Sequence, residues 1–133
     1  MSRQNVELVR EAIEAFNEVG MAEAALTFFD TDAVFEEPPE QPSPTVAEGR
    51  DAAIRTFAQF EQAWEEHRSE TEEIHVVDDE RVLVLSIEHF RGRDGIEISQ
   101  PCGNLFTVRG EKVVRLQAFW DRTNALRAAG LSE

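Results

Sequence analysis

Apolar residues recur at helical spacing in two parts of the first half of the chain. The first group consists of Val6, Val9, Ile13 and Phe16. This spacing predicts a helix that ends at Gly20, and a shorter helix follows from Met21 to about Phe29. The second group follows Gly49 and predicts a third helix. Its members are Ile54, Phe57, Phe60 and Trp64.

Strand-like alternation replaces this spacing in the second half of the chain. The pattern predicts strands over roughly 69–77, 81–91 and 96–108, separated by the polar breaks 78–80 and 92–95. One short strand, 33–37, lies earlier and stops at Pro38-Pro39, and the proline-bearing segment behind it is a candidate rim or flap. We therefore predict an α+β fold in a single domain, residues 1–133, with N-terminal helices packed on a curved antiparallel sheet.

The last predicted hairpin runs from Asn104 to Asp121. Its second strand is apolar on one face, formed by Val114, Leu116, Ala118 and Trp120. A two-residue turn at Gly110-Glu111 would pair Asn104 with Gln117 and turn it away from that face. A three-residue loop, 109–111, would pair Asn104 with Leu116 and place it on that face.

The other face of this hairpin predicts an assembly. Val113, Phe119 and Leu105 would form an apolar patch on the convex side of the sheet. A closed two-fold dimer is the commonest way to bury such a patch, so we predict a homodimer through the convex face.

Charge and cysteine content narrow the classes of partner. The formal net charge is -14, and the isoelectric point is near 4.6. Nucleic acid and anionic membrane surfaces would be repelled, so neither is a predicted partner. Cys102 is the only cysteine, which excludes an internal disulfide. The amphipathic N-terminus resembles neither a signal peptide nor a membrane span, and we expect a cytoplasmic protein.

Several segments together resemble a known family. They are the helix and short helix, the strand sequence 32–38, the segment 48–51 before the third helix, and the terminal strand 116–121. This order resembles the SnoaL-like branch of the NTF2-like superfamily over nearly the whole chain. The resemblance implies a cone-shaped α+β barrel. It does not imply one chemistry, because the superfamily includes ketosteroid isomerase, polyketide cyclases and non-catalytic binding modules.

Similarity to ketosteroid isomerase implies two candidate catalytic residues. Its proton-shuttling carboxylate, which precedes a proline at the end of the first strand, corresponds to Glu37. Its oxyanion-hole carboxylic acid corresponds to Asn104, which favours the three-residue loop. Its oxyanion-hole tyrosine falls near Ile13, but this chain contains no tyrosine.

Both candidates have a chemical rationale and a simpler alternative. A carboxylate at the mouth of an apolar cone is suited to remove a proton from carbon next to a carbonyl, whereas Glu37 is otherwise a solvated surface acid. The amide of Asn104 would donate to a developing oxyanion, or be satisfied by neighbouring backbone. The predicted substrate-binding residues are Phe35, Phe57, Phe60, Trp64, Gln100, Leu116, Ala118 and Trp120. The alternative is that these aromatic residues pack on each other as an ordinary core.

Other polar residues carry weaker signals. His67, His75 and His89 have no spacing that puts two ligands on one face, so we predict no metal site and no cofactor. Cys102 lacks a recognisable histidine partner, which disfavours a nucleophile. The predicted function is a small isomerase or lyase/cyclase-type enzyme acting on a lipophilic carbonyl compound. The alternative is a non-catalytic ligand-binding or protein-interaction module of the same fold.

Overall fold

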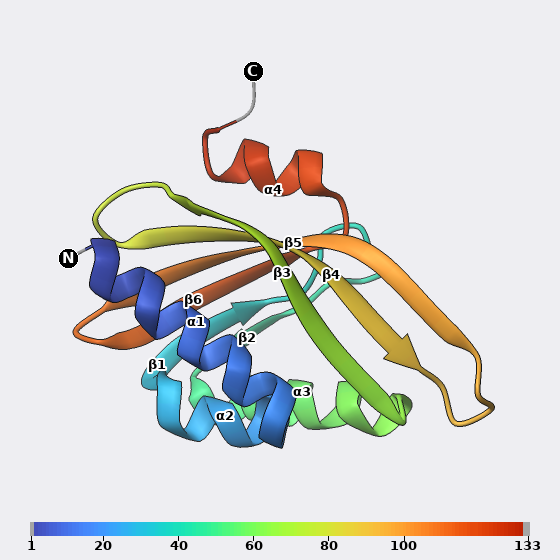
Figure 1. Ribbon diagram of the computed structural model, residues 1–133. Helices are drawn as coiled ribbons and strands as arrows, with labels where there is room; N and C mark the ends of the chain where they lie inside the picture. Colours follow the sequence, from blue (N-terminus) through green and yellow to red (C-terminus); the bar gives the residue numbers. More distant parts are fainter. Residues whose placement is uncertain (1, 132–133) are drawn as a thin grey trace.

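The computed structural model describes residues 2–131 as helices packed on a strongly curled sheet (Figure 1). The helices are α1 (Ser2–Val19), α2 (Met21–Phe28), α3 (Arg50–Ala63) and α4 (Arg122–Ala128). The strands are β1 (Phe29–Glu36), β2 (Val46–Glu48), β3 (Glu66–Val76), β4 (Arg81–Arg91), β5 (Glu97–Arg109) and β6 (Lys112–Phe119). The predicted α+β class and cone-like arrangement are confirmed.

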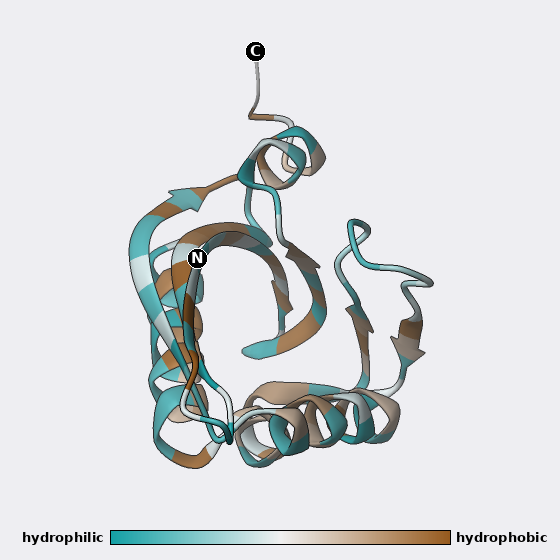
Figure 2. Cartoon of the chain, turned by 90° about the vertical axis from the view of Figure 1, so that its right-hand side faces the viewer, coloured by the Kyte–Doolittle hydropathy of each residue, from teal (hydrophilic) through white to brown (hydrophobic). Residues whose placement is uncertain are grey.

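The sheet is mixed rather than purely antiparallel. Its strand order is β2-β1-β6-β5-β4-β3, and all neighbours are antiparallel except β1 and β6. These two strands are parallel because the chain leaves β1, passes through α3 and the β3–β6 meander, and returns beside β1 in the same direction. The sheet curls strongly without closing into a barrel (Figure 2).

The main core lies between the helices α1, α2 and α3 and the concave face of the sheet. Phe29 and Phe57 are at most 2% exposed, and their rings meet edge to face with centroids 5.7 Å apart. Burying a side chain of this size stabilises the fold by about 2–3 kcal/mol. These contacts pack α3 against β1 in the main core.

Helix α4 covers part of the opposite face of the sheet (Figure 1). Asp121 caps it, because its Oδ1 accepts the Thr123 N–H at 2.8 Å. Close contact with β5 requires Gly103, where an added Cβ would lie 2.5 Å from the Cβ of Ala125. Among the described residues, no helix has the length and apolarity needed to cross a membrane.

The prediction of an apolar patch on the convex face of the sheet is wrong. Leu105 and Phe119 are 1% and 8% exposed because they pack in a second core with α4. Val113 is fully buried in the main core instead. Helix α4 and the main core together therefore bury the three residues on which the dimer prediction was based.

Candidate functional site

A cavity of about 340 Å³ opens between the concave face of the sheet, α1, α3 and the proline-bearing segment. Its walls are mainly apolar, and they include six of the eight predicted substrate-binding residues. These are Phe35, Phe57, Phe60, Leu116, Ala118 and Trp120. Phe57 is packed in the core, whereas Phe60 and Trp120 are 36% and 43% exposed. The aromatic residues are thus divided between the core and the cavity wall, and substrate binding by them stays a prediction.

The other two predicted residues, Trp64 and Gln100, do not line this cavity. Trp64 follows the last residue of α3 with extended backbone, and its ring lies 4.9 Å from that of Phe90. Gln100 lies on the part of β5 that continues beyond the last pair with β6, Gly103 with Phe119. In the part of the chain that the structure describes, β5 pairs only with β4 at that point.

Glu37 lines the cavity and also holds the proline-bearing segment. Its Oε1 accepts the backbone N–H of Thr45 at 2.8 Å and the Thr45 hydroxyl at 2.7 Å. Its own N–H donates to the Thr45 carbonyl at 3.0 Å. The segment between them is thereby closed into a loop, and Pro38 and Gln41 from this loop line the cavity.

The same loop is fastened at a second point, to the start of α4. The carboxylate of Glu40 accepts the Trp120 N–H at 2.9 Å and the Asn124 side-chain amide at 2.8 Å. Burial alone would raise the pKa of Glu40, but these hydrogen bonds outweigh burial and lower it. Glu40 thus holds the loop next to Trp120, and both line the cavity.

Asn104 lines the cavity, although the hairpin turn differs from the predicted three-residue loop. Gly110 and Glu111 both have positive φ, 59° and 62°, which is a two-residue type I′ turn. Val114 is then an extra residue in β6, a β-bulge between the pairs Val108–Val113 and Thr107–Arg115. The bulge shifts the register by one, so that Asn104 pairs with Ala118 and faces the cavity with it.

The amide of Asn104 is available to a ligand. Asn104 is half-buried, and within residues 2–131 its side chain has no hydrogen-bond partner, yet its amide atoms are not fully buried. An unpaired amide on an apolar wall is a ready donor or acceptor.

A buried polar cluster surrounds Glu88, and no sequence pattern predicted it. His67 Nε2 lies 2.6 Å from Glu88 Oε1, and the hydroxyls of Ser69 and Ser86 donate to Glu88 Oε2 at 2.7 and 2.5 Å. His67, Ser69 and Glu88 all line the cavity. Burial alone would raise the pKa of Glu88, but the hydrogen bonds from His67, Ser86 and Ser69 outweigh burial and hold it below its ordinary range. Glu88 is therefore an ionised carboxylate within the cavity wall.

A second β-bulge brings this cluster together. Glu72 is an extra residue in β3, between the pairs Thr71–Ser86 and Glu73–Leu85. Without it, Glu88 would lie opposite Glu70 and share a face with it, because side chains alternate along a strand. With it, Glu88 pairs with Ser69.

Arg122 of α4 holds the bulge from behind the sheet. Its guanidinium donates to Glu72 Oε1 at 2.6 Å, to the Ser86 carbonyl at 2.6 Å and to the Cys102 carbonyl at 3.3 Å. One side chain thus links β3, β4 and β5 directly behind the polar cluster.

The side chain of Cys102 also bears on the chemistry of the cavity. The Cys102 thiol lines the cavity, and its pKa is raised to about 12 by burial and by the charge of Glu88. A thiol of this kind is a poor nucleophile. Among residues 2–131, no group of three or more His, Cys, Asp or Glu side chains is placed to hold a metal ion.

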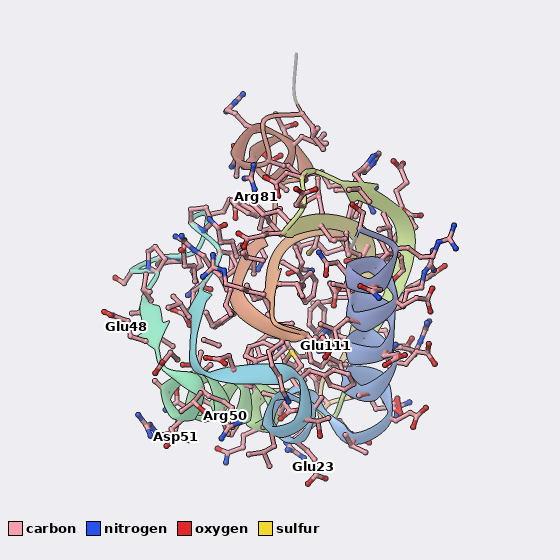
Figure 3. The ribbon with its side chains drawn as sticks, turned by 90° about the vertical axis from the view of Figure 1, so that its left-hand side faces the viewer. Glu23, Glu48, Arg50, Asp51, Arg81 and Glu111 are labelled. Atoms are coloured by element: carbon pink, nitrogen blue, oxygen red, sulfur yellow. The ribbon has the colours of Figure 1, made fainter. Side chains whose placement is uncertain are left out.

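The segment 48–51, which contributed to the family resemblance, lies outside the cavity. Glu48 and Asp51 are exposed at the periphery of the molecule, next to the start of α3 (Figure 3). Gly49 has a φ of 95° and its N–H donates to the Ala33 carbonyl, so this segment joins β1, β2 and α3. Its role is to form the fold rather than to contact a ligand.

Comparison with known proteins agrees with this architecture. A family model described as a SnoaL-like domain matches residues 9–116. An NTF2-like protein of unknown function from Burkholderia pseudomallei K96243 is 19% identical, with a TM-score of 0.77 over 93% of this chain and 95% of that one. No curated protein matches the sequence significantly.

Two other solved structures with this fold contain small molecules. TerC, co-crystallized with polyporic acid, is 15% identical, with a TM-score of 0.77 over 96% of this chain and 98% of TerC. A protein with a ketosteroid isomerase-like fold from Catenulispora acidiphila DSM 44928, in complex with trimethylamine, is 17% identical. Its TM-score is 0.74 over 94% of this chain and 93% of that one.

Proposed function

The chain belongs to the SnoaL-like family, and we propose that it is a small-molecule enzyme of isomerase or lyase/cyclase type acting on a lipophilic carbonyl compound. The observation that carries this proposal is the apolar cavity with Glu37 and Asn104 in its walls. Pockets for small molecules are typically apolar with a few convergent polar groups. Solved relatives that hold trimethylamine and polyporic acid support binding of a small molecule by this fold.

In the proposed reaction, Glu37 removes a proton from the carbon next to the carbonyl. The Oε1 atom of Glu37 accepts two hydrogen bonds from Thr45, whereas within the described residues its Oε2 has no hydrogen-bond partner. Oε2 is therefore the proposed proton acceptor. The Asn104 amide donates to the oxygen on which negative charge develops. A positioned base typically contributes about 10²–10⁴-fold, and one oxyanion donor about 10²–10³-fold.

The alternative function is a non-catalytic ligand-binding or protein-interaction module. Two observations favour it. The chain has no tyrosine to complete an isomerase-type oxyanion hole, and Glu37 already serves to close the loop through Thr45. The same cavity would then bind a lipophilic molecule without converting it.

Hydrogen exchange at carbon separates the two functions. We expect the protein to accelerate exchange of the acidic C–H protons of 2-tetralone with D₂O, followed by NMR, and Glu37→Gln to abolish the acceleration. Glu36→Gln is the matched control, because Glu36 pairs with Arg115 and does not line the cavity. Saturable binding of 2-tetralone without Glu37-dependent exchange would establish the binding module instead.

The homodimer and the cytoplasmic location remain predictions. The patch that motivated the dimer is buried, so its remaining support is the general frequency of two-fold dimers. Light scattering at micromolar concentration should show twice the chain mass, and a 15.1 kDa species alone would refute it.

A further inference from the structure

The histidine of the buried cluster has one ring nitrogen engaged and one free. Nε2 is held by Glu88, so in the neutral ring the proton lies on Nε2 and Nδ1 carries the lone pair. Within residues 2–131, Nδ1 has no hydrogen-bond partner, and it is not among the fully buried atoms. Nδ1 is therefore an accessible proton acceptor.

The imidazole ring is held rigidly in the cavity wall. It stacks on Phe90 with centroids 4.7 Å apart and an interplanar angle of 9°, and Phe60 meets it edge-on at 5.3 Å. The His67 and Glu88 side chains are only 18% and 10% exposed. A fixed, partly desolvated base needs little reorganisation when charge develops beside it.

His67 also lies where two cavities adjoin. A second cavity of about 540 Å³ has a more polar lining and shares Phe16, Asn17, Met21, His67 and Phe90 with the first. His67 therefore contacts both the apolar and the polar cavity.

We propose that His67, oriented by Glu88, accepts the proton of an enol or phenol hydroxyl on a lipophilic ligand in the apolar cavity. This inference rests on the proposed function, because it requires the cavity to bind such a ligand, and it narrows the ligand to compounds with an acidic hydroxyl. In the transfer, the ligand O–H bond breaks, an N–H bond forms at Nδ1, and the electron pair stays on oxygen. The imidazolium then lies between two anions, the ligand oxyanion and Glu88.

The charges around the ring are compatible with this transfer. Glu88 on β4 is the anion in direct contact with it, and a carboxylate that orients a histidine also stabilises the imidazolium. The polar cavity adds charged side chains from four segments of the chain. They are Glu61 of α3, Glu65, Glu66 and Arg68 around the start of β3, Arg91 of β4 and Glu97 of β5. Arg91 pairs with Glu66 at 2.9 Å and with Glu65 at 3.6 Å, which partly cancels these charges.

The test uses two probes that differ in one methyl group, 4-nitrophenol and 4-nitroanisole. At a pH where free 4-nitrophenol is mainly protonated, we expect the wild-type protein to bind it and to raise its visible phenolate absorbance. It should bind 4-nitrophenol about tenfold more tightly than 4-nitroanisole. A hydrogen bond to a charged partner typically increases affinity by about this factor or more. His67→Gln should remove both effects. His75→Gln is the matched control on the same strand, since His75 lies outside both cavities.

The possible results separate this inference from the proposed function. If the wild type binds 4-nitroanisole but gives no phenolate band with 4-nitrophenol, the role of His67 is overturned and the cavity is kept. A phenolate band that persists in His67→Gln would also overturn the role of His67. Failure of both probes to bind would overturn the cavity and this inference together. If circular dichroism shows that His67→Gln is unfolded, Glu88→Gln replaces it. That variant can keep the hydrogen bonds of the cluster but lacks the anion, so it should weaken the phenolate band.

Discussion

Replacement of Phe57 by alanine should lower the free energy of unfolding by about 3–5 kcal/mol, the usual cost of removing a buried phenyl ring. Phe57 is 2% exposed, and its ring centroid lies 5.7 Å from that of Phe29 and 4.7 Å from that of Phe35. A chain of 133 residues typically has a free energy of unfolding of about 7–20 kcal/mol, so the variant should still fold.

The matched control is Phe60→Ala on the next turn of α3. Phe60 is 36% exposed, so about two thirds of its side chain is buried. Its removal should therefore lower the free energy of unfolding by about 1–2 kcal/mol. Because Phe60 lines the open part of the cavity, its removal should weaken binding of 4-nitroanisole while affecting stability less.

Urea unfolding followed by tryptophan fluorescence measures both changes. With a slope of about 2 kcal/mol per M, Phe57→Ala should lower the midpoint by about 2 M and Phe60→Ala by less than 1 M. Equal losses for the two variants, or a loss below about 1 kcal/mol for Phe57→Ala, would refute the division of α3 into a core position and a cavity position.

Three further predictions concern the polar cluster and its surroundings. Because the pKa of Glu88 lies below its ordinary value of 4.5, its ionised form stabilises the fold above about pH 4.5, and this contribution is lost as the pH falls through the folded-state pKa. The stability difference between wild type and Glu88→Gln should therefore shrink in acid, and a difference that stays constant down to pH 2 would contradict this. Arg122→Met should lower the free energy of unfolding by about 1–3 kcal/mol, because it leaves the buried Ser86 carbonyl without its side-chain donor. Thermal or urea unfolding measures this change, and wild-type stability in the variant would refute a stabilising role for the Arg122 hydrogen bond. The Cys102 thiol, with a pKa of about 12, should react with iodoacetamide at pH 8 only after unfolding, and rapid labelling of the native protein would show that it is not buried.

Local patterns along the chain determine the helices and most of the strands. Apolar spacing and the breaks at Gly20 and Gly49 predict α1, α2 and α3, because these features depend on residues within one or two turns of each other. The same patterns predict β4 at its observed bounds and the aromatic walls of the cavity. The family resemblance correctly indicates the fold, since the order of elements is itself a property of the sequence.

Strand register is where local patterns stop being sufficient. In the hairpin, a two-residue turn alone would point Asn104 away from the cavity, and the bulge at Val114 reverses this. In β3, the bulge at Glu72 likewise puts His67 and Ser69 on the same face of the sheet as Glu88. A single extra residue moves every later side chain to the other face, because the period along a strand is two.

Neither bulge was predicted from the local sequence pattern, and the bulge in β3 depends on a contact made far along the chain. Glu72 is held by Arg122, fifty residues later, and α4 can reach it only once β5 and β6 are in place. The sequence alone therefore determines which residues can form helices, strands and an apolar cavity. Only the tertiary structure decides that His67, Glu88 and Asn104 face the same cavity, because this depends on how the strands align across the sheet.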